Sequence, residues 1–341
     1  MNNIYESKYL KYKKKYLRLK YNQHNQHNQT SGGQFMVNLG IHLQKLPFGS
    51  YLAQKATDYC DKYKSNNDVI DRINKFAQDY DIKPSTIEQC QDIPDTKPLE
   101  CWAKFKTPND FFIRKRINLP TINYNLNTSL IVAPCDSYCI YLLQSNANIW
   151  IKGKNFSLDM LLFNKQNPDF DKTNYELLIF RLAPQHYHRF HSPINGQILN
   201  ISKYGTKYYS VDPIIVNSSI DVYTENVRLV IKIKINNEQI AWLVIIGATC
   251  IGSIELTHKE ITKAFNNKDS ISDKLINESS TIDLSSHNIL IQLNEELGYF
   301  QYGGSTVLLV FTKGVVKATE LGLNLQSNQE IELKVGDELF K

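Results

Sequence analysis

In the N-terminal third of the chain, the hydrophobic positions follow the spacing of α-helices. In residues 69–80 they recur at intervals of three and four, which places them on one face of a helix. Asn67 or Asp68 precedes this face and can serve as its N-cap. Residues 85–88 have the form of a capping box and predict another helix start. Residues 107–112 place a threonine before a proline, which predicts a short helix with proline at its first position.

From about residue 128 hydrophobic and polar positions alternate, as they do in β-strands. The predicted strands are 129–133, 137–143, 175–183, 197–202, 227–235, 241–247, 288–293, 305–312 and 315–319. Glycine, proline or asparagine separates them, as at 193–196. Residues 257–286 are polar and predict a mobile insertion. The expected fold is α+β, with a helical N-terminal part followed by a mainly antiparallel β core.

This pattern divides the chain into a leader with a polar linker at 1–35, a helical region at 36–115 and a β-rich core at 116–341. Charge supports a separate leader. Residues 1–21 carry a net charge of +6, whereas the whole chain carries +5, so the remainder is close to neutral. A nucleic-acid-binding body needs its own basic face, so we expect no nucleic-acid partner.

The leader predicts a helix over residues 4–21, with tyrosines along one stripe and lysines on the other faces. Such a helix fits a solvated or self-associating segment, and it also fits an anchor on an anionic membrane surface. It further resembles the Tyr/Lys-rich leaders of giant-virus proteins. No apolar signal sequence is present, and the longest uncharged apolar run, 240–254, is shorter than a membrane span. We therefore expect peripheral membrane association on the cytoplasmic side, without a transmembrane segment or signal peptide.

The six cysteines form no C-x-x-C pair. In a chain of 341 residues without a signal peptide, this favours free thiols in a reducing compartment.

Three of the eight histidines, His186, His188 and His191, lie in one short segment. On a strand His186 and His188 would share a face, which permits two zinc ligands, but no cysteine or carboxylate nearby in sequence supplies a further one. Each histidine is also compatible with a hydrogen-bonded role in the core. We expect no metal site.

Asp136, His191 and Ser305 form a set that can activate a hydroxyl group. The imidazole takes the serine proton, and the carboxylate fixes the imidazole tautomer. Taken singly, Asp136 and Ser305 also fit turn residues. The order Asp-His-Ser matches subtilisin-type proteases. Ser305, however, begins a predicted strand and lacks their small-residue-rich nucleophile helix, so a secreted hydrolase fits poorly.

Seven collinear segments resemble motifs of the phosphatidylserine decarboxylase family. They cover roughly residues 105–318 and occur in the family's order; they are 109–115, 151–158, 182–193, 209–216, 221–228, 247–254 and 296–306. The segment 182–193 is similar to the family's histidine motif, and 296–306 ends in the Gly-Gly-Ser-Thr of its processing site.

The resemblance implies a proenzyme that cuts itself between Gly304 and Ser305, giving a β chain of 1–304 and an α chain of 305–341. Asp136 and His191 match the acid and base of this step. Ser305 attacks the Gly304 carbonyl to form an ester, and β-elimination then leaves dehydroalanine, which hydrolyses to a covalent pyruvoyl cofactor.

The pyruvoyl ketone would form a Schiff base with phosphatidylserine at a membrane surface and accept the electrons released with CO₂, giving phosphatidylethanolamine. His188 or His191 would return a proton to the α-carbon, and the sequence does not choose between them.

Two alternatives remain: a decarboxylase of a soluble amino acid such as tryptophan, and a non-catalytic membrane-associated homologue. One departure from the family is Ser137, where a glycine usually follows the aspartate. If that glycine has a positive φ, Ser137 would be strained.

Overall fold

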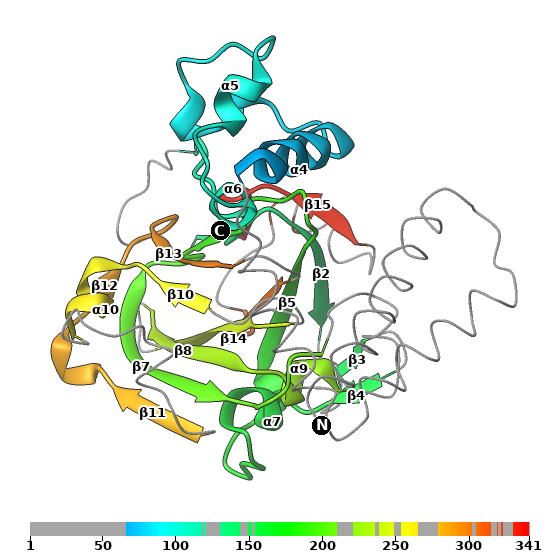
Figure 1. Ribbon diagram of the computed structural model, residues 1–341. Helices are drawn as coiled ribbons and strands as arrows, with labels where there is room; N and C mark the ends of the chain where they lie inside the picture. The colour runs from blue at the N-terminus through cyan, green and yellow to red at the C-terminus, as the bar shows by residue number, and fades with distance from the viewer. Residues whose placement is uncertain are drawn as a thin grey trace, which may run out of the picture.

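A small helical region lies above a β-rich core in the computed structural model (Figure 1). The residues that the structure describes are 66–117, 119–120, 130–143, 149–151, 154–209, 221–235, 239–248, 254–264, 279–301, 305–314, 319, 322 and 330–340. The predicted leader helix, the linker and the predicted strand at 315–319, apart from residue 319, lie outside them.

We call residues 66–117 the cap. It contains helices α4 (Asn66–Asp79), α5 (Pro98–Trp102) and α6 (Pro108–Phe112), with 3₁₀ turns at Pro84–Thr86 and Glu88–Cys90. Its buried hydrophobic cluster comprises Val69, Ile73, Ala77, Ile87, Cys90, Cys101, Trp102, Phe105 and Phe111. The cap is therefore organised around its own small core.

One of the three predicted helix starts, that of α6, agrees with the structure. The amphipathic segment forms α4, although α4 begins at Asn66, so Asn67 and Asp68 lie inside the helix. Helix α6 has the predicted start, and Thr107 and Asp110 form a reciprocal capping box. The capping box predicted at 85–88 is wrong, because this segment forms two 3₁₀ turns without side-chain caps. The Ser85 hydroxyl instead donates to Asp95, which ties the first turn to the loop before α5.

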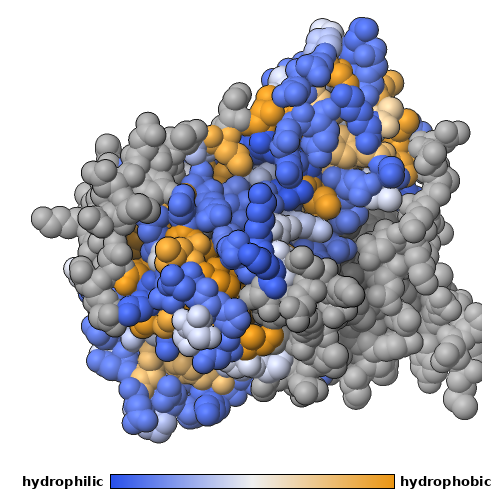
Figure 2. All heavy atoms as spheres, turned by 90° about the vertical axis from the view of Figure 1, so that its left-hand side faces the viewer, coloured by the Kyte–Doolittle hydropathy of each residue, from blue (hydrophilic) through white to orange (hydrophobic). Residues whose placement is uncertain are grey.

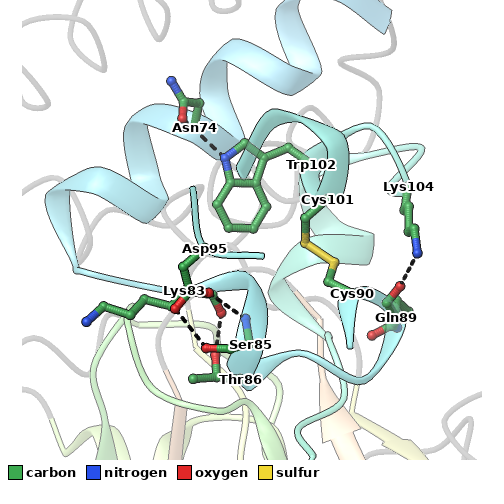
Figure 3. The surroundings of a disulfide bond; sticks show 10 residues. All are labelled: Asn74, Lys83, Ser85, Thr86, Gln89, Cys90, Asp95, Cys101, Trp102 and Lys104. Atoms are coloured by element: carbon green, nitrogen blue, oxygen red, sulfur yellow. Dashed lines mark hydrogen bonds between the residues drawn. A yellow bond between two sulfur atoms is a disulfide. The ribbon is translucent and has the colours of Figure 1, made fainter. Parts of the chain in front are cut away.

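A disulfide bond joins Cys90 and Cys101 across the cap (Figure 3). Their Cα atoms are 5.4 Å apart, and both residues are fully buried. The expectation of free thiols is therefore wrong for this pair, because folding of the 3₁₀ turn against α5 brings together two cysteines that no short motif links. Cys135 and Cys139 are free and buried, and burial raises the pKa of both thiols well above the ordinary value.

The core is built on a nine-stranded antiparallel sheet. In spatial order its strands are β11 (Ser279–Asp283), β7 (Gly196–Tyr204), β8 (Arg228–Lys234), β9 (Ile240–Ile246), β14 (Ser305–Thr312), β5 (Tyr175–Leu182), β2 (Ser137–Leu143) and β15 (Ile331–Leu333), with β12 (Leu290–Ile291) also paired to β7. The long apolar runs of β9, β5 and β14 explain the centre of the sheet, because strands that are covered on both faces need hydrophobic residues throughout.

Short sheets complete the core. One has the order β10 (Ile254–Leu256), β13 (Glu296–Phe300) and β6 (Arg189–His191), and the others pair β1 (Ile131–Val132) with β16 (Glu338–Phe340) and β3 (Ile149–Ile151) with β4 (Lys154–Phe156). Most of these strands are absent from the predicted set, because runs of two to five residues carry little periodicity.

The polar segment 257–286 is not simply an insertion. It contains helix α10 (Lys259–Ala264), and β11 within it forms the edge of the large sheet against β7.

A buried arginine joins two short helices to the large sheet. Arg228 on β8 donates to the carbonyls of Leu161 in α7 (Leu158–Phe163) and Thr224 in α9 (Val222–Glu225). Burial lowers the pKa of Arg228 to about 10, so its guanidinium remains charged at neutral pH.

Within the described part of the chain, the helices are all too short or too polar to span a lipid bilayer. On the face shown in Figure 2, hydrophobic side chains form separate patches between hydrophilic ones.

Candidate active site

Ser305 is the first residue of the central strand β14, and its side chain is fully buried. It pairs with Leu182 on β5, and the next residue, Thr306, pairs with Ile246 on β9. Strand pairing on both sides thus fixes the start of β14. The prediction that Ser305 opens a strand is confirmed.

His188 contacts Ser305 directly. Its Nδ1 lies 3.1 Å from the Ser305 Oγ, and its Nε2 lies 3.1 Å from the carbonyl oxygen of Ala183. A carbonyl can only accept a hydrogen bond, so the neutral ring carries its proton on Nε2. Nδ1 is then the acceptor for the Ser305 hydroxyl. This arrangement aims a basic nitrogen at the hydroxyl group.

Burial is the main reason that the pKa of His188 lies well below the ordinary value. The nearby Arg114 guanidinium lowers it further, as does His186, while the Ala183 and Pro184 carbonyls oppose the change. His188 is therefore neutral at pH 7, the state in which Nδ1 can accept a proton.

His191 faces other partners. Its Nδ1 donates to the Asn294 carbonyl at 2.9 Å, and its Nε2 accepts from the Tyr187 hydroxyl at 3.2 Å. Burial lowers the pKa of His191, whereas the bond to Asn294 and the charge of Glu296 raise it. Within the described residues, the hydrogen bonds of His191 do not include Ser305.

Asp136 is a buried acidic residue directly before the start of β2. Arg116 Nη1 donates to both of its carboxylate oxygens at 2.9 and 2.8 Å, and the backbone N–H of Val335 donates to Oδ1 at 3.0 Å. The backbone N–H of His191 donates to Pro134, two residues before Asp136. Asp136 and His191 are therefore neighbours, but they share no hydrogen bond among the described residues.

His186 lies in the turn before β6 rather than on a strand with His188. Its Nδ1 accepts from the Ala183 backbone N–H, and its Nε2 is 3.5 Å from Glu332. In the described part of the chain, no three His, Cys, Asp or Glu side chains are grouped closely enough to hold a metal ion.

The cap supplies one wall of the site. The Phe112 ring stacks on His188 with centroids 3.8 Å apart, and Arg114 Nη2 donates to the Gln185 carbonyl at 3.0 Å. In the opposite direction, Arg189 Nε donates to the Ile113 carbonyl at 2.9 Å. Side chains thus cross between the cap and the histidine segment from both sides.

Four of these residues were not singled out from the sequence: Phe112, Arg116, Tyr187 and Asn294. The aromatic residues resemble core residues, and Arg116 resembles any surface arginine. Asn294 has a φ of +62°, a conformation that asparagine tolerates better than most residues. The only available signal was their position within or beside segments that resemble the family's motifs.

Ser137 shows no sign of the strain considered for it. It is the first residue of β2, pairs with Leu333 and is absent from the positive-φ residues of the described chain. Its hydroxyl lies 3.4 Å from the Cys135 carbonyl. Serine is therefore compatible with this position.

Residues 109–341 match the family model described as phosphatidylserine decarboxylase, which is more than half of the chain. The chain belongs to the phosphatidylserine decarboxylase family. A phosphatidylserine decarboxylase proenzyme from Clostridium tetani is 30% identical over 313 residues, which cover 89% of this chain and 88% of that protein.

Longer fungal relatives also match. Phosphatidylserine decarboxylase proenzyme 2 of Saccharomyces cerevisiae is 34% identical over 235 residues, or 68% of this chain and 18% of that protein. Proenzyme 3 of Schizosaccharomyces pombe is 34% identical over 240 residues, or 69% of this chain and 22% of that protein. The chain thus spans about a fifth of these fungal proteins. Membership of this family of pyruvoyl-dependent proenzymes supports a pyruvoyl cofactor.

Proposed function

We propose that this chain is a phosphatidylserine decarboxylase proenzyme that cuts itself between Gly304 and Ser305 and then converts phosphatidylserine to phosphatidylethanolamine and CO₂. The observation that carries the proposal is the buried Ser305 hydroxyl facing Nδ1 of a neutral His188. The family match and the relatives' names support the substrate.

Self-cleavage needs a nucleophile, a base and a backbone bond within reach. The Ser305 Oγ attacks the carbonyl carbon of Gly304, the C–N bond breaks, and the chain continues through an ester. β-Elimination then releases the Gly304 carboxylate, and hydrolysis of the resulting dehydroalanine releases ammonia. Two glycines before the serine avoid a Cβ near the reacting carbonyl.

We assign Asp136 and His191 to this first step, in line with the family resemblance. Support comes from the Asp136 charge, which helps to raise the pKa of His191, and from the bond between the His191 N–H and Pro134. The Tyr187 hydroxyl engages Nε2 of His191, so the proposed role requires that the tyrosine release this nitrogen and that His191 approach Ser305.

Position 305 fits a pyruvoyl group. It is buried at a strand end beside His188, and the Phe112 ring covers that histidine. The group would supply an electrophilic ketone that binds the substrate amine and accepts the electron pair released with CO₂. We assign His188 to this second step, because its neutral Nδ1 faces position 305. This nitrogen would accept a proton from the substrate amine and would then return it to the α-carbon.

The membrane surface is part of the proposal. The basic leader supports attraction to anionic lipid, on the cytoplasmic side and without insertion of a spanning helix. The leader's likeness to giant-virus proteins supports a viral origin. After cleavage, the two fragments would remain partners within one folded unit.

Intact mass and CO₂ release test the proposal. The wild-type chain should yield a fragment of residues 305–341 with a blocked N-terminus and release CO₂ from phosphatidylserine vesicles. Ser305→Ala and His191→Ala should each stay whole. A wild-type chain that never cleaves would contradict the proposal, and CO₂ release from a free amino acid but not from vesicles would replace the lipid substrate.

A further inference from the structure

Phe112 covers the face of the histidine that contacts Ser305. The two ring centroids are 3.8 Å apart, and the planes differ by 26°. Both side chains are nearly or fully buried. The ring plane of His188 decides where Nδ1 points, so whatever holds this plane also sets the direction of the contact with position 305.

The position of Phe112 is itself well defined. It is the last residue of α6, a helix whose start is fixed by the Thr107–Asp110 capping box. Immediately after it, Arg189 binds the Ile113 carbonyl and Arg114 binds the Gln185 carbonyl. Hydrogen bonds from an arginine of the cap and from an arginine of the histidine segment therefore both hold the two stacked rings together.

A hydrogen bond from Nε2 to the Ala183 carbonyl holds one edge of the His188 ring, on the side of the Ala183–Pro184 backbone. One hydrogen bond restrains rotation about the Cβ–Cγ bond of the histidine only in part. After cleavage the Ser305 hydroxyl no longer exists, so its contact with Nδ1 is lost as well. The stack with Phe112 then constrains the plane of the ring, together with the bond to Ala183.

We infer that Phe112 is a positioning residue for the decarboxylation step, which holds the His188 ring in the orientation that aims Nδ1 at position 305. This inference rests on the proposed function. Phe112 acts through His188 and does not react itself.

Loss of the stack has a consequence for the pH profile. Burial is the largest cause of the lowered pKa of His188, and the stacked Phe112 ring contributes to that burial. The charged or titratable groups around the ring are Arg114 from the cap and His186 from the same turn, both of which also lower the pKa. Removing the phenyl ring admits water, so the pKa of His188 should rise toward its ordinary value. The acid limb of activity should then move to higher pH.

The test compares Phe112→Leu with Phe112→Tyr in the full chain. Self-cleavage, measured by intact mass, shows that each variant folds. With phosphatidylserine in vesicles, we expect Phe112→Leu to lose about 10- to 100-fold in kcat, with little change in KM and an acid limb at higher pH. Phe112→Tyr keeps a six-membered ring and should restore kcat and the wild-type pH profile.

Nuclear magnetic resonance of ¹⁵N-labelled histidine gives a readout that does not depend on activity. His188 should titrate at higher pH in Phe112→Leu than in the wild-type chain. An unchanged titration, or an unchanged kcat and pH profile in Phe112→Leu, would overturn the inference. If Phe112→Leu does not fold, Phe112→Met replaces it under the same criteria. A wild-type chain without decarboxylase activity would remove the proposed function while the titration still decided the contact.

Discussion

The cap and the β core are stabilised in different ways. The cap relies on a few aromatic side chains and the Cys90–Cys101 disulfide, whereas the core rests on a sheet in which the central strands are almost fully buried. The core places Ser305 through backbone pairing, and the cap reaches the same site through side chains such as Phe112 and Arg116. The candidate serine thus belongs to the sheet, and side chains of the cap contribute to its surroundings.

The largest expected effect is the loss of decarboxylation rate when a histidine of the core is replaced. His188→Ala should lower decarboxylation of phosphatidylserine by about 10²- to 10⁴-fold, because it removes the nitrogen that faces position 305. The measurement is CO₂ release per cleaved chain. His186→Ala is the matched control, since its ring contacts Ala183 and Glu332 and should leave most of the rate. Equal losses in both variants would show that the effect is only structural.

Breaking the disulfide tests the side of the cap. Reduction with a phosphine, or the double change Cys90→Ala and Cys101→Ala, should destabilise the cap by about 3 kcal/mol, since the bond closes a loop with a sequence separation of 11. Limited proteolysis within residues 66–117 should accelerate, while the core stays resistant. The reductant should have no further effect on the double variant. If reduction does not change the rate of proteolysis within the cap, the disulfide does not stabilise the cap as we propose.

The ion pair between Arg116 and Asp136 joins the two regions. Arg116→Leu leaves buried Asp136 with the Val335 N–H and, at 3.7 Å, the Lys334 ammonium group, and we expect a loss of about 2 kcal/mol in unfolding free energy. The part-exposed position of Arg116 keeps the expected loss below that for a fully buried pair. Denaturant titration measures it. Arg116→Lys should recover part of the stability, because it keeps the charge.

The smallest effect concerns acid stability. Burial lowers the pKa of His188 in the folded chain, so below about pH 6.5 the unfolded chain binds more protons than the folded one. The contribution of His188 to the free energy of unfolding should therefore be fully present above about pH 6.5. It should fall as the pH decreases toward the folded-state pKa, by up to about 1.4 kcal/mol per pH unit. Urea midpoints at pH 7.5 and 5.5 measure the change. His188→Gln should reduce the difference, and a larger dependence in that variant would contradict the assignment.

Sequence periodicity predicted the parts of the fold that depend on local pattern. The strands at 137–143 and 305–312 have the predicted bounds, and α6 begins where its capping residues indicate. The disulfide was missed because its two cysteines are adjacent only after the chain has turned. The contact of Phe112 with His188 was missed for the same reason, since 76 positions of sequence separate two residues whose rings touch.

The candidate site divides in the same way. Residue identity and order indicated Asp136, His188, His191 and Ser305 as candidates, because their chemistry is visible in their side chains. Which imidazole faces the serine depends on the turn before β6, and one-dimensional spacing does not determine that turn.

The place of Ser305 in the sheet determines what a cut before it would do to the molecule. Strand β14 pairs with β5 from Ser305 to Thr312 and with β9 from Thr306 to Phe311. A new chain end at this point would lie at the middle of the sheet, with neighbours from the other fragment on both sides. The two pieces would therefore migrate as one species through any native column, and an affinity tag on either piece would retain both. Only a denaturant would reveal that the backbone is no longer continuous.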